Sequence, residues 1–249
     1  MKLEIKNVAE NEYSIFVYGD IVGQKDVDFW TGEPNESDID VADFKKATEE
    51  ISSGSKLNMY VNSAGGDVFA TSTIVSILNR VKEKGVEINA YIDGVACSCA
   101  SWLLMVANNI NIYKNSVMMI HKPLVMSYGN ADDLAKDIEV LNKIEDGVII
   151  PMYETKAKCG KKKIKDMMQK ETWLTANEIS EYFNVNYIDE AKVVENVKSD
   201  LFNTYKNTPK SFSKVEENQP REIVTKEKID YTYYKNILKQ LEEIHKWKI

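Results

Sequence analysis

Short apolar runs alternate with amphipathic segments along most of the chain. Runs of β-branched and aromatic residues that end in Gly, Asn or Asp predict strands, and apolar residues spaced three and four apart predict helices. The predicted strands cover residues 14–18, 57–61, 86–92, 110–113 and 117–121, with a last short strand next to residues 187–190. The predicted helices cover residues 41–51, 68–84 and 98–107, with a long helix near 130–158 and another that begins at Ala176.

Capping signals support two of these helix boundaries. Asp67 stands where an N-cap is needed, and Gly85 follows the last apolar position of that helix. Thr175 and Glu178 have the spacing of a capping box, which places a helix start at Ala176. The alternation of strands and helices predicts an α/β domain over residues 1–198, with the polar stretch 23–40 as a loop.

The composition and the charge of the chain change after this domain. Residues 199–226 are polar and hold two prolines, which predicts a linker. Residues 227–249 carry apolar side chains at helical spacing (Tyr234, Ile237, Leu241 and Ile244), which predicts a short amphipathic helix. From Lys198 onward there are eleven basic and eight acidic residues, whereas the whole chain has a net charge of −7. The body is therefore strongly acidic, which argues against nucleic acid as the main partner.

Composition also indicates the cellular compartment of the protein. No apolar run reaches the length of a membrane span, and the charged N-terminus lacks the apolar core of a secretory signal. Three cysteines without zinc-site spacing are typical of a reducing compartment, so we expect a cytoplasmic protein that does not bind membranes. The sequence contains no recognisable metal, nucleotide or cofactor site.

Residues 94–102 (GVACSCASW) hold three candidate nucleophiles, Cys97, Ser98 and Cys99. A hydroxyl or thiol needs a base to attack a carbonyl at neutral pH, and imidazole is the usual one. His121, at the end of a predicted strand, is the candidate base, because His245 lies in the basic tail. Successive residues at a helix start project about 100° apart, so only one of the three can face His121. Chemistry alone favours a cysteine, since a thiol ionises more easily.

Two places offer backbone N–H groups for an oxyanion: the Gly65-Gly66 turn and the residue that follows the nucleophile at a helix start. A tight strand-to-helix turn would equally account for the two glycines. An acid that orients the imidazole could be any of several carboxylates, and their spacing does not choose among them. The candidates are Asp93, Asp132, Asp133, Asp166 and Glu171.

Four motifs in order, NSAGG (62–66), GVACSCA (94–100), MMIHKP (118–123) and ETWLTANE (171–178), resemble those of the Clp protease proteolytic subunit family over about residues 13–195. The resemblance implies a crotonase-like α/β fold with a long protruding helix and a serine endopeptidase that works without a cofactor. It implies Ser98 as nucleophile, His121 as general base and Glu171 as the orienting acid. It also implies Gly66 and Cys99 as oxyanion donors. The family acts on proteins and forms rings, usually stacked heptamers, docked through the long helix.

Some positions depart from the commonest family pattern. Ala64 replaces a proline, and Glu171 stands where housekeeping members carry aspartate. Four features look more like the Clp-related proteases of tailed phages and prophages. They are the YGDI motif (18–21), the loop with Trp30, the ETWLTA motif and the tail. That likeness implies cleavage of capsid or scaffold proteins during head maturation, independently of ATP. A housekeeping subunit with a separate AAA+ unfoldase and a catalytically silent ring or scaffold protein are the alternatives.

The predicted linker and tail are expected to contribute nothing to the active site. A chain truncated after Val197 should then still hydrolyse small peptides, while assembly or protein processing changes.

Overall fold

The computed structural model describes residues 5–9, 11–27, 31–191, 197–210 and 212. The chain divides into two units, Met1–Pro209 and Lys210–Ile249, and every described helix and strand belongs to the first. The predicted amphipathic helix at 227–249, His245 and Trp30 lie outside the described residues.

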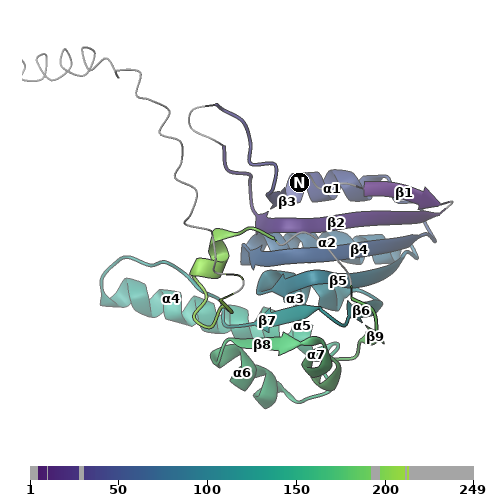
Figure 1. Cartoon of the computed structure of the whole chain (residues 1–249). Coiled ribbons are helices and arrows are strands. Elements are labelled where there is room, and N and C mark those ends of the chain that lie inside the picture. The colour runs from purple at the N-terminus through teal and green to yellow at the C-terminus, as the bar shows by residue number, and fades with distance from the viewer. Residues whose placement is uncertain (1–4, 10, 28–30, 192–196, 211, 213–249) are drawn as a thin grey trace, which may run out of the picture. The chain divides into compact units, whose positions relative to one another are not determined.

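A mixed sheet with a parallel centre forms the middle of the first unit (Figure 1). Its central path runs β1-β2-β4-β5-β6-β9, with β3 beside β2, and with β7 between β5 and β8. The β1–β2 and β7–β8 pairs are antiparallel and the other pairs are parallel. The predicted α/β class is confirmed. The strands are β1 Ile5–Ala9, β2 Glu12–Val22, β3 Ile39–Asp40, β4 Lys56–Gly66, β5 Glu87–Cys97, β6 Asn109–Tyr113, β7 Val117–Ile120, β8 Thr172–Thr175 and β9 Asn186–Ile188.

Helices connect the parallel strands, as right-handed crossovers require. The predicted helix at 98–107 is shorter, an α-helix followed by a 3-10 turn, and the predicted long helix contains a π-helical turn. The helices are α1 Val41–Glu49, α2 Val68–Glu83, α3 Cys99–Leu103, η1 Leu104–Val106, α4 Ala131–Ile144, the π-turn η2 Glu145–Ile149, α5 Ile150–Glu154, α6 Lys161–Gln169, α7 Ala176–Tyr182 and η3 Asp200–Asn203.

The predicted caps are present. The Asp67 side chain accepts a hydrogen bond from the backbone N–H of Ala70 at the start of α2. Thr175 and Glu178 form the capping box of α7, in which the Glu178 carboxylate accepts from the Thr175 N–H. Both caps satisfy N–H groups that a helix start leaves without intrahelical partners.

Strand β5 belongs to two branches of the sheet. Its first half, Asn89–Ile92, pairs with β6, and its last residues, Val95–Cys97, pair with β7. Residues 94–97 therefore extend the strand, whereas the predicted strand ended at residue 92. The change of partner separates β7 and β8 from β6 and places the ends of β4, β5 and β7 around one point.

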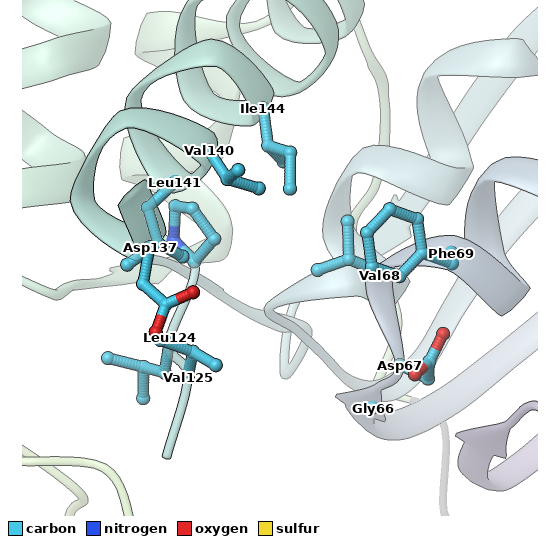
Figure 2. Close-up of a pocket in the computed structure, with 11 residues that line it drawn as sticks. Gly66, Asp67, Val68, Phe69, Leu124, Val125, Asp137, Val140, Leu141 and Ile144 are labelled. Atoms are coloured by element: carbon cyan, nitrogen blue, oxygen red, sulfur yellow. The ribbon is translucent and has the colours of Figure 1, made fainter. Parts of the chain in front are cut away.

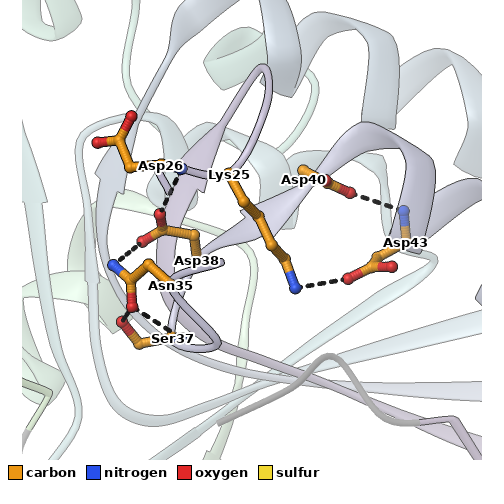
Figure 3. A network of polar contacts seen from close by, with 7 residues as sticks. All are labelled: Lys25, Asp26, Asn35, Ser37, Asp38, Asp40 and Asp43. Atoms are coloured by element: carbon orange, nitrogen blue, oxygen red, sulfur yellow. Dashed lines mark hydrogen bonds and ion pairs between the residues drawn. The ribbon is translucent and has the colours of Figure 1, made fainter. Parts of the chain in front are cut away.

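The loop between β2 and α1 is stabilised by its own side chains (Figure 3). Asp38 is buried and accepts hydrogen bonds from the Asn35 side chain and from the Asp26 backbone N–H. Lys25 pairs with Asp43 on α1 at 2.7 Å. The loop predicted at residues 23–40 is therefore confirmed for its described residues up to position 38. Strand β3 then begins at Ile39.

Residues 199–209 belong to the compact unit, whereas the sequence analysis placed them in the linker. They contain η3, and the rings of Phe202 and Tyr205 are buried against β4 and β8. In Figure 1 this light-green segment lies beside the end of β4. Burial of two aromatic side chains stabilises the segment enough to order it, despite its polar composition.

Among the described residues, no helix combines the length and the apolar character needed to cross a membrane.

Candidate active site

Ser98 occupies a sharp turn between β5 and α3. Its backbone has φ 52° and ψ −125°, a region that a residue with a side chain rarely adopts. The Ser98 N–H still donates to the Met119 carbonyl at 2.9 Å, so the β5–β7 pairing continues to the turn itself. Such a turn lifts the side chain out of the sheet at the carboxyl ends of parallel strands.

The turn directs the Ser98 side chain toward His121. The Nε2 atom of His121 lies 2.7 Å from the Oγ atom of Ser98, a normal hydrogen-bond distance. His121 directly follows β7, and β7 is the strand that pairs with the end of β5. The sheet register therefore brings together two residues that lie far apart in the sequence.

The two flanking cysteines are both buried, although the Cys99 thiol is hydrogen-bonded to Ser98. Cys97 is fully buried, and burial raises the pKa of its thiol far above the usual value. Burial also raises the pKa of the Cys99 thiol, to about 11, and that thiol donates to the Gly66 carbonyl at 3.1 Å. A thiol held protonated is a poor nucleophile, so the structure does not support the chemical preference for cysteine.

Glu171 lies next to His121 through the β7–β8 register. Ile120 pairs with Thr172 in this antiparallel pair, so the next opposed positions are His121 and Glu171. Glu171 has φ 50° and its side chain is buried. Its charge is close enough to raise the pKa of the His121 imidazole.

The Glu171 carboxylate is bonded to backbone amides. It accepts from the Lys206 N–H at 2.8 Å and from the Asn207 N–H at 2.5 Å. Among the hydrogen bonds of the described residues, none joins Glu171 to the His121 ring. The predicted acid is thus near the imidazole and acts on it through its electrostatic field in this conformation.

The other four candidate acids lie elsewhere. Asp93 is buried and accepts a hydrogen bond from the Tyr18 phenol. Asp132 and Asp133 are in the first turn of α4, where their backbone N–H groups bond to Asn130. Asp166 is exposed on α6. Of the five carboxylates considered, Glu171 is the one whose charge acts on His121.

The His121 imidazole is neutral at physiological pH. Burial lowers its pKa to about 4, although the Glu171 charge opposes this shift. Desolvation disfavours the charged imidazolium, so burial is the larger effect here. A neutral imidazole can accept a proton from Ser98.

The Gly65-Gly66 turn packs directly on the Ser98 turn. Gly65 has φ 107°, and a Cβ atom added to it would lie 2.7 Å from both the Cys97 carbonyl oxygen and the Ser98 Cβ. Only glycine permits this close approach to the Ser98 turn. The glycine is therefore needed for packing against Ser98, in addition to the tight strand-to-helix turn. Cys99 begins α3, so its N–H is among those without an intrahelical acceptor.

An apolar pocket of about 340 Å³ opens beside this arrangement (Figure 2). Val68 and Phe69 at the start of α2 form one wall, and Val140 and Ile144 of α4 form the opposite wall. The full lining is Gly66, Asp67, Val68, Phe69, Pro123, Leu124, Val125, Asp137, Val140, Leu141 and Ile144. It reaches from the glycine turn to the segment that follows His121.

Sequence reasoning missed Tyr205, which contacts the same site. Its ring meets the His121 ring edge-on with centroids 5.0 Å apart, and its hydroxyl donates to the Ala64 carbonyl at 2.5 Å. A usable signal existed in the sequence: Phe202 and Tyr205 are aromatic residues three apart in an otherwise polar stretch. That spacing is typical of a helical turn that packs against a core.

The fold and the site define a class: a parallel α/β protein with a histidine-bonded serine on a strained turn at the strand ends. The family model for Clp protease matches residues 41–192, which is more than half of the chain. The chain belongs to the Clp protease family.

Two curated relatives are similar over a shorter span. Both are described as ATP-dependent Clp protease proteolytic subunit, from two strains of Bacteroides fragilis. Each is 27% identical over 139 residues, which is 54% of this chain. The match covers 64% of one relative and 60% of the other, so the chain spans less than two thirds of either.

Proposed function

We propose that this protein is a serine endopeptidase of the Clp type, with Ser98 as nucleophile and His121 as general base. The observation that carries the proposal is the 2.7 Å contact between Ser98 Oγ and His121 Nε2 on the strained turn. Membership of the Clp protease family supports the same assignment.

The proposed reaction follows from these positions. Ser98 Oγ attacks the peptide carbonyl carbon as its proton passes to His121 Nε2, and the imidazolium then protonates the leaving amine. Water repeats the sequence on the acyl-enzyme, which releases the acid and restores Ser98. The Glu171 charge stabilises the imidazolium formed in each half-reaction. The N–H groups of Gly66 and Cys99 are the proposed donors to the oxyanion.

The apolar pocket supports an extended protein substrate. It begins at Gly66 and runs past Leu124 to α4, so a bound peptide would place apolar side chains there. We therefore propose a preference for apolar residues next to the scissile bond.

The exposed face of α4 supports assembly into a ring. None of the side chains of α4 is buried in the single chain, and Leu134 and Ile138 are 41% and 59% exposed. An apolar stripe on a protruding helix is typical of a surface that another subunit covers. We propose a homo-oligomeric ring, as a heptamer or as stacked heptamers, docked through this helix.

For the biological substrate, we propose capsid or scaffold proteins of a tailed phage, cut during head maturation in the host cytoplasm and the procapsid. The support is the amino-acid sequence of two motifs, YGDI and ETWLTA, together with the polar tail. Cleavage of the capsid or scaffold protein encoded beside this gene, without ATP, would test this. Dependence on an AAA+ unfoldase would instead favour the housekeeping alternative.

A fluorophosphonate probe tests the proposed chemistry. We expect one probe adduct per chain in the wild type and none in Ser98→Ala, as measured by intact mass. The Cys97→Ala variant serves as the matched control and should label like the wild type. An unlabelled wild-type protein in its assembled form would favour a catalytically silent ring or scaffold.

A further inference from the structure

Residues 199–209 lie beyond the part of the chain that matches the family model, yet they contact the proposed active site. Four separate links attach this segment to the domain. Ser199 donates to the Asp20 carboxylate at 2.8 Å, and Tyr205 donates to the Ala64 carbonyl. Backbone N–H groups bind the Glu171 carboxylate, and the Asn207 side chain donates to the Lys170 carbonyl at 2.8 Å.

Tyr205 links the imidazole to the glycine turn. The residue is 8% exposed and its ring packs against the His121 ring, while its hydroxyl donates to the carbonyl of Ala64, which precedes Gly65. Trp173 of β8 and Phe202 lie against the same ring, with centroids 6.5 and 6.3 Å away. Tyr205 is therefore fixed on several sides and has little freedom to move.

The backbone N–H groups of Lys206 and Asn207 bind the Glu171 carboxylate. Both carboxylate oxygens of Glu171 accept from this stretch of backbone, and the Asn207 amide also donates to the Glu171 carbonyl at 3.2 Å. Two N–H donors hold the carboxylate in one orientation. Because these bonds fix the carboxylate, they also fix the charge that acts on His121.

This segment leaves the apolar pocket open. The pocket is lined by the start of α2, residues 123–125 and α4, and no residue of 199–209 is among its lining. The segment lies on the side of His121 that faces Glu171 and β8 instead. The segment therefore lies against the proposed catalytic groups, with Tyr205 hydrogen-bonded to Ser98, and leaves the apolar pocket unoccupied.

We infer that residues 199–209 are part of the catalytic machinery, with Tyr205 and Asn207 as positioning residues for His121 and Glu171. This inference rests on the proposed function. Tyr205 shields one edge of the imidazole from water and steadies the Ala64-Gly65-Gly66 turn. Asn207 anchors the backbone that holds Glu171. Misplacement of a catalytic group by about 1 Å can cost about 10²-fold in rate, so small contacts here have large effects.

Point variants of the full chain test the inference with a small chromogenic peptide. Tyr205→Ala should lower kcat about 10–100-fold and leave KM within about threefold, because the segment does not line the cleft. It should also move the acid limb of kcat/KM to higher pH. Burial is the main cause of the low His121 pKa, the Glu171 charge opposes it, and removing the ring lets water reach the imidazole. Tyr205→Phe keeps the ring and should keep the wild-type pH profile.

Asn207→Ala should lower kcat about 10-fold, because it removes the side-chain anchors but keeps the N–H that binds Glu171. Lys162→Ala is the control, since it alters an exposed side chain on α6, outside residues 199–209. It should behave like the wild type.

Three results would overturn the inference while fluorophosphonate labelling of wild-type Ser98 still supports the proposed function. One is a folded Tyr205→Ala protein with wild-type kcat and pH profile. Another is a Tyr205→Ala protein that is faster than wild type, which would make the segment an inhibitor. The third is an Asn207→Ala protein with wild-type kcat, which decides the matter even if Tyr205→Ala does not fold. Absence of labelling in the wild type would overturn the proposed function itself.

Discussion

The Nε2 atom of His121 lies 2.7 Å from the Oγ atom of Ser98, the middle one of the three candidate nucleophiles. The backbone at Ser98 has φ 52°, and its side chain meets His121, whereas the Cys97 side chain is fully buried. A strained turn of this kind persists only where the surrounding structure determines it, here through the pairing of β5 with β7 and the approach of Gly65.

Ser98→Ala should abolish peptide cleavage, with a loss of several orders of magnitude, because only binding and oxyanion stabilisation remain. Cys97→Ala and Cys99→Ala should keep most of the activity, since both thiols are buried and protonated. Initial rates with a small peptide substrate measure both effects. Thiol-sensitive cleavage that persists in Ser98→Ala would transfer the nucleophile role to a cysteine.

Glu171→Gln should lower kcat about 10²–10⁴-fold, because the charge that favours the imidazolium is removed. One of the two backbone N–H donors would then face an amide NH₂ group, so we expect a loss of about 1–3 kcal/mol in the free energy of unfolding. Steady-state kinetics and urea unfolding measure the two effects. Near-normal turnover would exclude Glu171 as the acid. Glu171→Asp keeps the charge and should lose less.

Much of the fold could be predicted because apolar residues that become buried recur at regular spacing in the sequence. The Leu57–Val61 run and the stripe on α2 are both buried, and Asp67 caps its helix as expected. The sequence analysis did not extend β5 through Gly94–Cys97, because this stretch of small residues becomes a strand only by pairing with β7. Strand β8 was missed for the same reason, since its four residues depend on pairing with β7.

The motifs marked the region of the site but could not determine its geometry from local pattern. The choice among Cys97, Ser98 and Cys99 depends on one backbone turn whose φ angle no spacing rule predicts. The choice of Glu171 among five carboxylates depends on the β7–β8 register. The contact between Tyr205 and His121 joins residues 84 positions apart, so composition alone assigned it to a linker.

The His121 imidazole should titrate near pH 4 in an NMR experiment, well below the usual value of 6.5. Above pH 6.5 His121 contributes fully to stability, and this contribution is lost as the pH falls toward 4, because the unfolded chain binds the proton first. Asp20 has the opposite effect: burial raises its pKa to about 6, so its contribution is present below 3.8 and lost as pH rises through 6.

Comparison with His121→Gln isolates the histidine contribution from that of Asp20. We expect the variant to lose less stability than the wild type between pH 7 and pH 4.5, as measured by urea unfolding. A His121 resonance that titrates near 6.5 in the intact protein would contradict the buried, shielded imidazole.

Truncation distinguishes residues 199–209 from the rest of the tail. A chain that ends at Lys210 should keep small-peptide hydrolysis, because it retains Tyr205 and Asn207. A chain that ends at Val197 should lose about 10²-fold or more in kcat, since Glu171 loses its backbone donors. This differs from the expectation of the sequence analysis, in which the chain truncated after Val197 kept small-peptide hydrolysis. Equal rates for the two truncated chains would restore that expectation.

Ile138→Asp should prevent ring assembly and leave the subunit folded. Ile138 is 59% exposed on α4 and outside the apolar pocket, so the substitution disturbs neither the core nor the cleft. A buried carboxylate at an apolar contact between subunits is costly, which favours the dissociated form. Light scattering after gel filtration should therefore show a lower mass, with an unchanged circular dichroism spectrum. Lys136→Glu, a charge change at an exposed position of the same helix, is the matched control and should assemble normally. If Ile138→Asp assembles like the wild type, the subunits dock through a surface other than this stripe of α4.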